Sequence, residues 1–251
     1  MNKIFKMDMH RLLHSKVFYV SIIFTTVMAF AQAYTGMSTN LAGMLGVAEN
    51  GGDFMASAMG AGVINILLTI TLSIFICADY SGGFAKNIFT YHADKTEYLY
   101  GNLFTCAAMS AFLLILYTVE SAVALLLFQG EVILEGGIFG LLIFLLEKWL
   151  LSCGICSLIL TVLVLTRNMA WGIFGGFVVA TGGLSMGLIG LASMLHWDWL
   201  NSLYHLTLSG AGSLCTTVFD LSTLVRCVVV FGIWFGWSMV ASWKILSVKD
   251  I

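Results

Sequence analysis

The chain has 251 residues, of which 60% are hydrophobic and only 10% are charged, and its mean hydropathy is +0.98. A water-soluble fold with so little charge would expose large apolar patches, so this composition indicates a membrane protein. The formal net charge of −2 argues against nucleic-acid binding through phosphate contacts. Several apolar stretches reach the ~20 residues that a helix needs to cross a bilayer, which predicts an all-α, polytopic membrane protein.

The first segment, residues 1–16, predicts an amphipathic helix that lies on the membrane surface. Its apolar side chains recur on one side at helical spacing, while Lys3 and Lys6 lie mostly elsewhere. The next apolar segment contains Ala29-Phe30-Ala31, which is similar to a signal-peptide cleavage site. The long basic region before it favours a first span that is retained rather than cleaved.

Six spans are predicted, over residues of about 17–34, 58–78, 101–128, 138–166, 169–195 and 222–246. The longest polar stretch, 79–97, lies between the second and third spans. Asp94 and Glu97 have capping-box spacing there, which predicts that a helix begins at this point. An aromatic, amphipathic segment, 196–220, precedes the last span. The chain shows no soluble domain and no repeat, so a single transmembrane domain is expected over 1–251.

The basic residues set the predicted orientation of the spans. If the N-terminus is cytoplasmic, nine of the eleven Lys and Arg residues fall on the cytoplasmic side, and the other two, Lys148 and Arg226, fall within spans. The outer loops then contain only acidic charges, which include Glu49 and Glu131. This asymmetry predicts that both termini are cytoplasmic.

Motifs for enzymatic chemistry are absent from the sequence. It contains no Gly-x-x-x-x-Gly-Lys-Ser/Thr loop, so ATP would have to be hydrolysed by another chain. His10 and His14 fit a polar helix face better than a metal site. Cys153 and Cys156 form a single CxxC, which is interpreted as two small residues on one helix face. We therefore expect neither a catalytic residue nor a metal ligand set.

Charged residues inside the spans are costly and therefore informative. Glu120, Glu147 and Lys148 are expected to share one layer in the outer half of the bundle, while Arg226 lies near enough to the outer end of its span to extend to the interface. The favoured interpretation is structural ion pairing, for example between Glu120 and Lys148. The alternative is a proton or substrate relay.

The fifth span is rich in glycine. Gly172, Gly176, Gly183 and Gly187 recur on one face and form two GxxxG pairs, which permit close approach of another helix. The second span offers a comparable small, polar face that includes Gly62 and Asn65. Two interpretations stay open for this face: packing within one subunit, and a dimer or conduit face.

The second cytoplasmic segment carries a resemblance to a known family. Asp79-Tyr80-Ser81-Gly82-Gly83, followed by Lys86-Asn87-Ile88 and an aromatic entry to the third span at Tyr98, resembles permease subunits of type-2 ABC exporters. The six-span layout and the basic N-terminal helix match as well. This chain has Gly82-Gly83-Phe84 where the family commonly has Gly-Thr or Ser-Gly-Thr, which affects the register of the segment. Small permeases of this type often serve peptide export or self-protection against lantibiotic-type peptides.

The resemblance implies a role for each segment. Residues 1–16 would be the elbow helix, and residues 79–97 would be the coupling segment that docks on an ATPase subunit. The docking side chains within it would be Phe84, Lys86, Asn87, Ile88 and Phe89. The first implied partners are two ATP-binding cassette subunits, which would hold ATP and Mg²⁺. The others are a second permease, identical or paralogous, and membrane lipid. The implied location is a bacterial plasma membrane. This chain itself would bind no cofactor.

Two other functions stay open at this stage. One is an ion-coupled secondary transporter that uses Glu120, Glu147 and Lys148. The other is a membrane scaffold or sensor that transports nothing.

Overall fold

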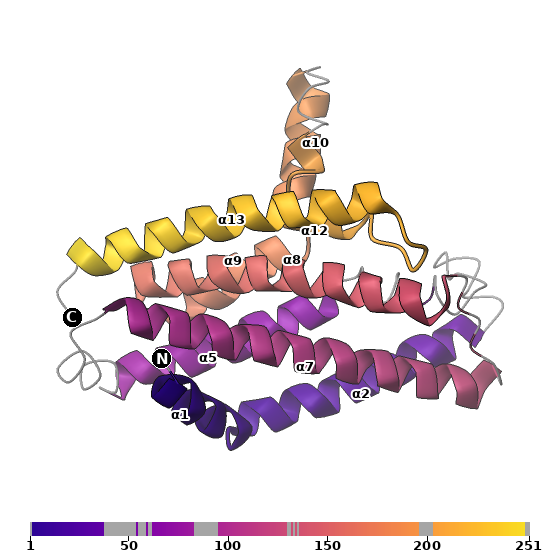
Figure 1. The fold of residues 1–251 in the computed structure, drawn as a ribbon, viewed down its shortest axis with the longest axis horizontal. Helices are drawn as coiled ribbons and strands as arrows, with labels where there is room; N and C mark the ends of the chain where they lie inside the picture. The colour runs from indigo at the N-terminus through magenta and orange to yellow at the C-terminus, as the bar shows by residue number, and fades with distance from the viewer. Residues whose placement is uncertain are drawn as a thin grey trace.

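The computed structural model describes a bundle of long helices. The described residues are 2–37, 54, 59, 62–82, 95–129, 132, 134, 136–195 and 203–248. Within them the chain forms helices and no strand, which confirms the all-α prediction. The long helices run side by side along the bundle (Figure 1) and are α2 (Lys16–Met37), α5 (Val63–Ser81), α7 (Lys95–Gln129), α8 (Gly137–Thr166) and α13 (Leu221–Val248).

The helices have the length and composition of membrane spans. Five described helices are long and apolar enough to cross a bilayer, and the bent pair α9 (Met169–Ala180) and α10 (Gly183–Leu195) makes up a sixth if it counts as one span. The protein is therefore a multi-pass membrane protein, as predicted. The helix α1 (Asn2–Leu13) and the C-terminal end of α13 lie at the same end of the bundle (Figure 1), as an even number of spans requires. The cellular side that this end faces stays a prediction.

Two predicted helix positions agree with the structure. The helix α1 occupies most of the segment expected to be an amphipathic helix, and it packs against α7 with Leu12 fully buried. The helix α7 begins at Lys95, directly after Asp94, where the capping-box spacing placed a helix start. Figure 1 shows α1 below α7 and at an angle to α2, which follows it in the chain.

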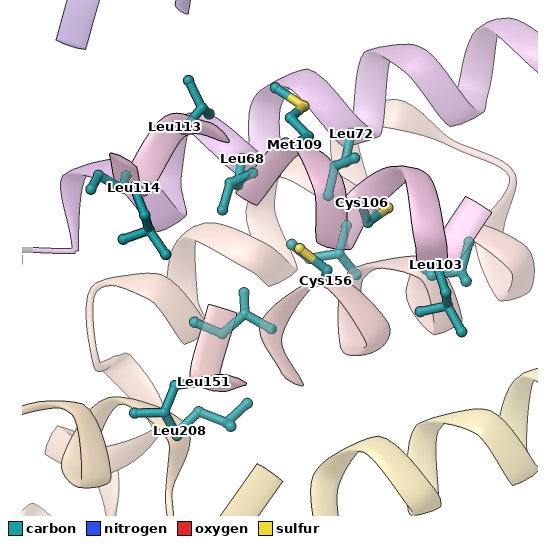
Figure 2. Packing of buried hydrophobic residues seen from close by; sticks show 14 of the residues in the cluster. Leu68, Leu72, Leu103, Cys106, Met109, Leu113, Leu114, Leu151, Cys156 and Leu208 are labelled. Atoms are coloured by element: carbon teal, nitrogen blue, oxygen red, sulfur yellow. The ribbon is translucent and has the colours of Figure 1, made fainter. Parts of the chain in front are cut away.

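The core lies where α5, α7 and α8 meet. Figure 2 shows its closely packed apolar side chains, which include Leu68, Leu72, Cys106, Met109, Leu113, Leu151 and Cys156. Large apolar side chains also cover the outside of the bundle, for example Phe139, Met186 and Trp237. In lipid this outer surface is already in an apolar solvent, so close packing and polar contacts, rather than the hydrophobic effect, stabilise the bundle.

The segment after α10 folds back onto the bundle. Its short helix α12 (Leu208–Gly212) packs against α8 and α13, and Leu208 and Ala211 are buried. The Thr207 hydroxyl caps this helix by accepting a hydrogen bond from the Gly210 N–H at 3.0 Å. The described part of 196–220 is thus a packed element of the bundle, which amphipathicity alone did not predict.

The last span, α13, begins at a well-defined cap. Asp220 accepts hydrogen bonds from the backbone N–H of Ser222 and from the hydroxyl groups of Ser222 and Thr223. These bonds, chiefly the one from the Ser222 hydroxyl, hold the pKa of the Asp220 carboxyl below its usual value. The start of α13 is thereby fixed next to α8, the helix with which it makes its most extensive contact.

Candidate functional site

A partly open cavity of about 300 Å³ with polar and apolar lining lies between α5, α8, α12 and the junction of α9 with α10. Its polar lining comes from side chains on each of these elements: Asn65, Lys148, Thr181, Ser185, Tyr204, Ser209 and Ser213. Lys148 lies eleven residues into α8, which places it ~16 Å along the helix axis and away from both helix ends. Polar groups at such a depth need partners inside the protein, because lipid offers none.

The cavity exists because the fifth span is broken. A single helix was predicted over 169–195, but α9 ends at Ala180 and α10 begins at Gly183 after a bend of 59°. Gly182 has a φ of +78°, a conformation that glycine adopts readily and that L side chains rarely adopt. As a result α10 points away from the bundle (Figure 1), and its first N–H groups have no partner within their own helix.

Hydroxyl groups stabilise this junction. The Ser185 hydroxyl donates to the Gly182 carbonyl at 2.6 Å, and the Ser209 hydroxyl donates to Ser185 at 3.1 Å. The second bond ties α10 to α12 across the cavity wall. The break is therefore built into the bundle by side chains from two separate segments.

Lys148 supplies the positive charge of the cavity. Its side chain is buried, and its Nζ donates to the carbonyl of Gly212 at 2.7 Å and lies 5.4 Å from the ring centre of Phe144. An ammonium group carries three N–H donors, so this carbonyl uses only one of them. The Asn65 side chain accepts from the Ser152 hydroxyl at 2.8 Å through Oδ1, which leaves its amide N–H groups for the cavity. The cavity lining thus includes one buried cation and one side-chain amide, groups that can bind an anionic or carbonyl-bearing group.

The expected pairing of Glu120 with Lys148 is wrong. Glu120 belongs to α7 and faces α2, where its Oε1 accepts from the Thr26 hydroxyl at 2.5 Å. Lys148 faces α12 instead, and the described residues show no ion pair between the two. Both charges lie in the halves of α7 and α8 that adjoin the connection between these helices, but depth along the axis does not fix the side of the helix on which a residue lies.

The other two intramembrane charges have different surroundings. Glu147 is buried and lies beside two cysteines, Cys215 and Cys227. Arg226 lies near the start of α13 and is exposed, in agreement with a side chain that extends to the interface.

The predicted glycine face is divided by the break. Gly172 and Gly176 of α9 pack within the chain: a Cβ on Gly172 would lie 2.7 Å from Oγ of Ser73, and one on Gly176 would lie 2.1 Å from Cγ2 of Thr69, both on α5. A Cβ on Gly62 would lie 2.4 Å from the carbonyl oxygen of Ala180, at the end of α9. These contacts belong to packing within one subunit, the first of the two interpretations.

Gly183 and Gly187 lie apart from that contact. The atoms nearest to a Cβ on Gly183 would belong to Val178 of the preceding helix, and a Cβ on Gly187 would have none of the described atoms within 4 Å. The prediction that all four glycines share one face is therefore wrong, because the bend turns α10 away from α5. Asn65, the remaining member of the predicted face, lines the cavity.

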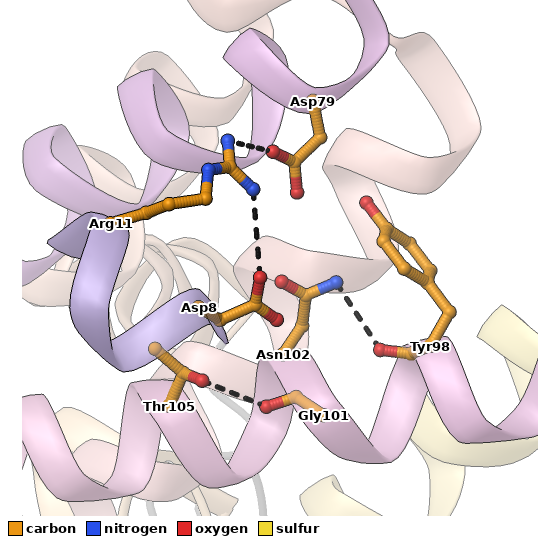
Figure 3. A network of polar contacts seen from close by, with 7 residues as sticks. All are labelled: Asp8, Arg11, Asp79, Tyr98, Gly101, Asn102 and Thr105. Atoms are coloured by element: carbon orange, nitrogen blue, oxygen red, sulfur yellow. Dashed lines mark hydrogen bonds and ion pairs between the residues drawn. The ribbon is translucent and has the colours of Figure 1, made fainter. Parts of the chain in front are cut away.

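A polar network that the sequence did not predict joins α1 to the end of α5. Arg11 donates to Asp79 at 2.5 Å and lies 3.5 Å from Asp8, and Figure 3 shows both carboxylates converging on the one guanidinium. Burial and the nearby charge of Asp79 raise the pKa of Asp8 to about 6, while Arg11 acts in the opposite direction. Two features of the sequence could have indicated this network: Asp8 is the one acidic residue in the basic segment 1–16, and Asp79 lies at the end of the second predicted span.

The ATPase-docking residues suggested by the family resemblance, Phe84, Lys86, Asn87, Ile88 and Phe89, lie outside the described residues. The described chain reaches Gly82 and resumes at Lys95. An open hollow of about 790 Å³ adjoins this point and is lined by Tyr80 of α5 and by Arg167 and Asn168 of the turn between α8 and α9. Arg167 lies 5.8 Å from the ring centre of Tyr80.

No protein-family model matches the sequence, and neither does any curated protein.

Proposed function

We propose that this chain is the permease subunit of an ATP-driven exporter of the type-2 ABC class, which moves a peptide or another amphipathic substrate. The observation that carries the proposal is the polar cavity at the broken span, with buried Lys148 in its wall. A buried charge and non-helical backbone at membrane depth are costly, and proteins retain them mainly where they line a substrate site.

The size of the cavity restricts what it would hold. A volume of about 300 Å³ is at the lower limit of ligand sites. It suits one side chain or one terminal carboxylate of a peptide rather than a whole peptide. The Lys148 ammonium and the Asn65 amide would bind such a group, and the remainder of the substrate would extend along the small-residue faces of α5 and α10.

The energy source is proposed from the inner end of the bundle. The chain carries no phosphate-binding loop, so ATP-driven work has to enter through a contact with another subunit. The polar sequence 79–97 and the hollow beside Tyr80 and Arg167 are the proposed place of that contact. A second permease, identical or paralogous, would complete the transport route. In this proposal both termini are in the cytoplasm of a bacterial cell.

A secondary transporter is the second candidate. Glu147 and Lys148 are adjacent, buried and close to the cavity, which is the feature that favours it. Glu120 no longer supports an ion relay, because it faces α2 rather than the cavity. A scaffold without transport activity has no specific observation in its favour.

Affinity purification in mild detergent, followed by mass spectrometry, tests the partner. An ATP-binding cassette subunit should copurify, and the double substitution Phe84→Asp with Ile88→Asp should release it while the six spans stay inserted. Purification without an ATPase, together with flux that needs a proton gradient and no ATP, would establish the secondary transporter instead.

The cavity is tested separately in the same complex. Lys148→Met should leave the ATPase bound but reduce substrate-stimulated ATP hydrolysis at least tenfold. Lys244→Met is the matched control, because Lys244 is exposed near the end of α13 and far along the chain from the cavity lining. Equal activity of both variants would show that the cavity is not the substrate site.

A further inference from the structure

Three buried side chains from separate elements meet beside the cavity. Glu147 lies on α8, Cys215 follows α12, and Cys227 lies on α13; one potential ligand atom from each falls within 4.8 Å of the others. Their side chains are almost fully buried, with exposed fractions of 2%, 4% and 0%. We propose that Glu147, Cys215 and Cys227 bind a thiophilic divalent metal ion of the zinc class. This inference is independent of the proposed transport function.

The fold brings the three residues together through glycines at the start of α8. A Cβ on Gly136 or Gly140 would lie 1.9 or 2.1 Å from the Thr217 carbonyl oxygen, so only glycine lets the chain after α12 approach α8 this closely. That approach places Cys215 beside the second and third turns of α8, where Glu147 projects. The extensive packing of α13 on α8 adds Cys227.

The distances suit tetrahedral coordination. The sulfur atoms of Cys215 and Cys227 are 3.6 Å apart. Two thiolates bound to one tetrahedral Zn²⁺, each ~2.3 Å from the ion, are separated by about 3.8 Å. A carboxylate oxygen of Glu147 completes three protein ligands, and the fourth position remains for water or another small ligand. Sulfur ligands select zinc, cobalt or cadmium over calcium and magnesium, which prefer oxygen ligands.

The charges also balance when a divalent ion is bound. Metal binding releases the two thiol protons, so Glu147 and the two thiolates together contribute three negative charges. Lys148 lies within electrostatic range of all three groups and contributes one positive charge. A divalent cation makes this sum zero, the same net charge as that of Glu147 and Lys148 with both thiols protonated, so metal binding adds no net charge to the interior of the bundle.

Cobalt is the most direct probe of this site. A variant with Cys77, Cys106, Cys153 and Cys156 replaced by alanine retains only the proposed thiol pair. Titrated with Co²⁺ in detergent and under a phosphine reductant, it should bind one ion per chain and develop thiolate-to-cobalt charge-transfer absorption. Cys215→Ser or Cys227→Ser should weaken binding at least a hundredfold and remove most of this absorption. Glu147→Gln should weaken cobalt binding at least tenfold but retain the charge-transfer absorption, because both thiolates remain.

The unmodified protein gives a second measurement that does not depend on the folding of any variant. Excess Zn²⁺ should raise its unfolding temperature, and Cys153→Ser, the matched control, should preserve that increase. Absence of both stoichiometric cobalt binding and zinc stabilisation would overturn the proposal. The proposal would also be overturned if Cys215 and Cys227 form a disulfide and the reduced thiol pair then fails to bind metal.

Discussion

Replacing Gly176 by alanine should destabilise the fold, whereas the same replacement at Gly187 should not. A Cβ on Gly176 would lie 2.1 Å from Cγ2 and 2.7 Å from Oγ1 of Thr69, while ordinary contact begins at 3.4 Å, so the shortfall is 3.4 − 2.1 = 1.3 Å. Thr69 cannot easily turn aside, because it is β-branched and its hydroxyl donates to the Asn65 carbonyl at 2.8 Å. The helices α5 and α9 would have to separate.

The two variants together isolate the cost of that separation. Both gain the same helix propensity when glycine becomes alanine, about 1 kcal/mol in soluble helices, so this gain cancels in their difference. Overpacking of a tight contact costs about 1–3 kcal/mol, which is the expected difference in unfolding free energy between Gly176→Ala and Gly187→Ala. Unfolding by dodecyl sulfate in mixed micelles, followed by circular dichroism, measures it.

A second substitution identifies the contact partner. Thr69→Ala removes both atoms nearest to the new Cβ, so it should recover at least about half of the loss in the Gly176→Ala background. The oligomeric state should stay unchanged in all variants, because the contact lies within one chain. Equal stability of the two alanine variants would refute the packing argument. Loss of a dimer in Gly176→Ala alone would assign the face to a subunit interface.

Further predictions concern the buried charges. Because the pKa of Asp8 is raised from 3.8 to about 6 in the folded protein, the folded state binds the proton more tightly than the unfolded chain does. The contribution of Asp8 to the unfolding free energy should therefore fall by about 3 kcal/mol as pH rises from ~4 to above 6, and Asp8→Asn should reduce the pH dependence by that amount; an unchanged slope in the variant would exclude Asp8 as a source. Glu120→Gln and Lys148→Met should have additive effects on unfolding free energy, since Glu120 bonds to Thr26 and Lys148 to Gly212. If the double variant is more stable than additivity predicts, that result would support a Glu120–Lys148 ion pair, which the structure does not contain. Thr26→Val should cost about 1–2 kcal/mol in the same unfolding assay, because it removes a hydrogen bond to a carboxylate.

The sequence by itself determined the membrane class and most of the spans. Hydropathy over ~20 residues needs only local composition, because a helix in lipid satisfies its own backbone groups and no distant residue has to be known. The start of α7 at Lys95 and the surface helix α1 followed from equally local rules of capping and amphipathicity. The single-domain layout and the placement of charges in the outer half of the spans came from the same local information and stay predictions.

Only the tertiary structure decided which residues meet. Periodicity placed four glycines on one face, but a two-residue turn at 181–182, with a positive φ at Gly182, bends the span by 59° and directs half of that face away from α5. Depth suggested that Glu120 pairs with Lys148, whereas the rotation of each helix about its axis directed the first to α2 and the second to α12. The joining of Glu147 with Cys215 and Cys227 depends on a chain reversal that brings residues 68 positions or more apart into contact. Rotation, bending and reversal are set by packing between distant segments, and no local pattern in the sequence encodes them.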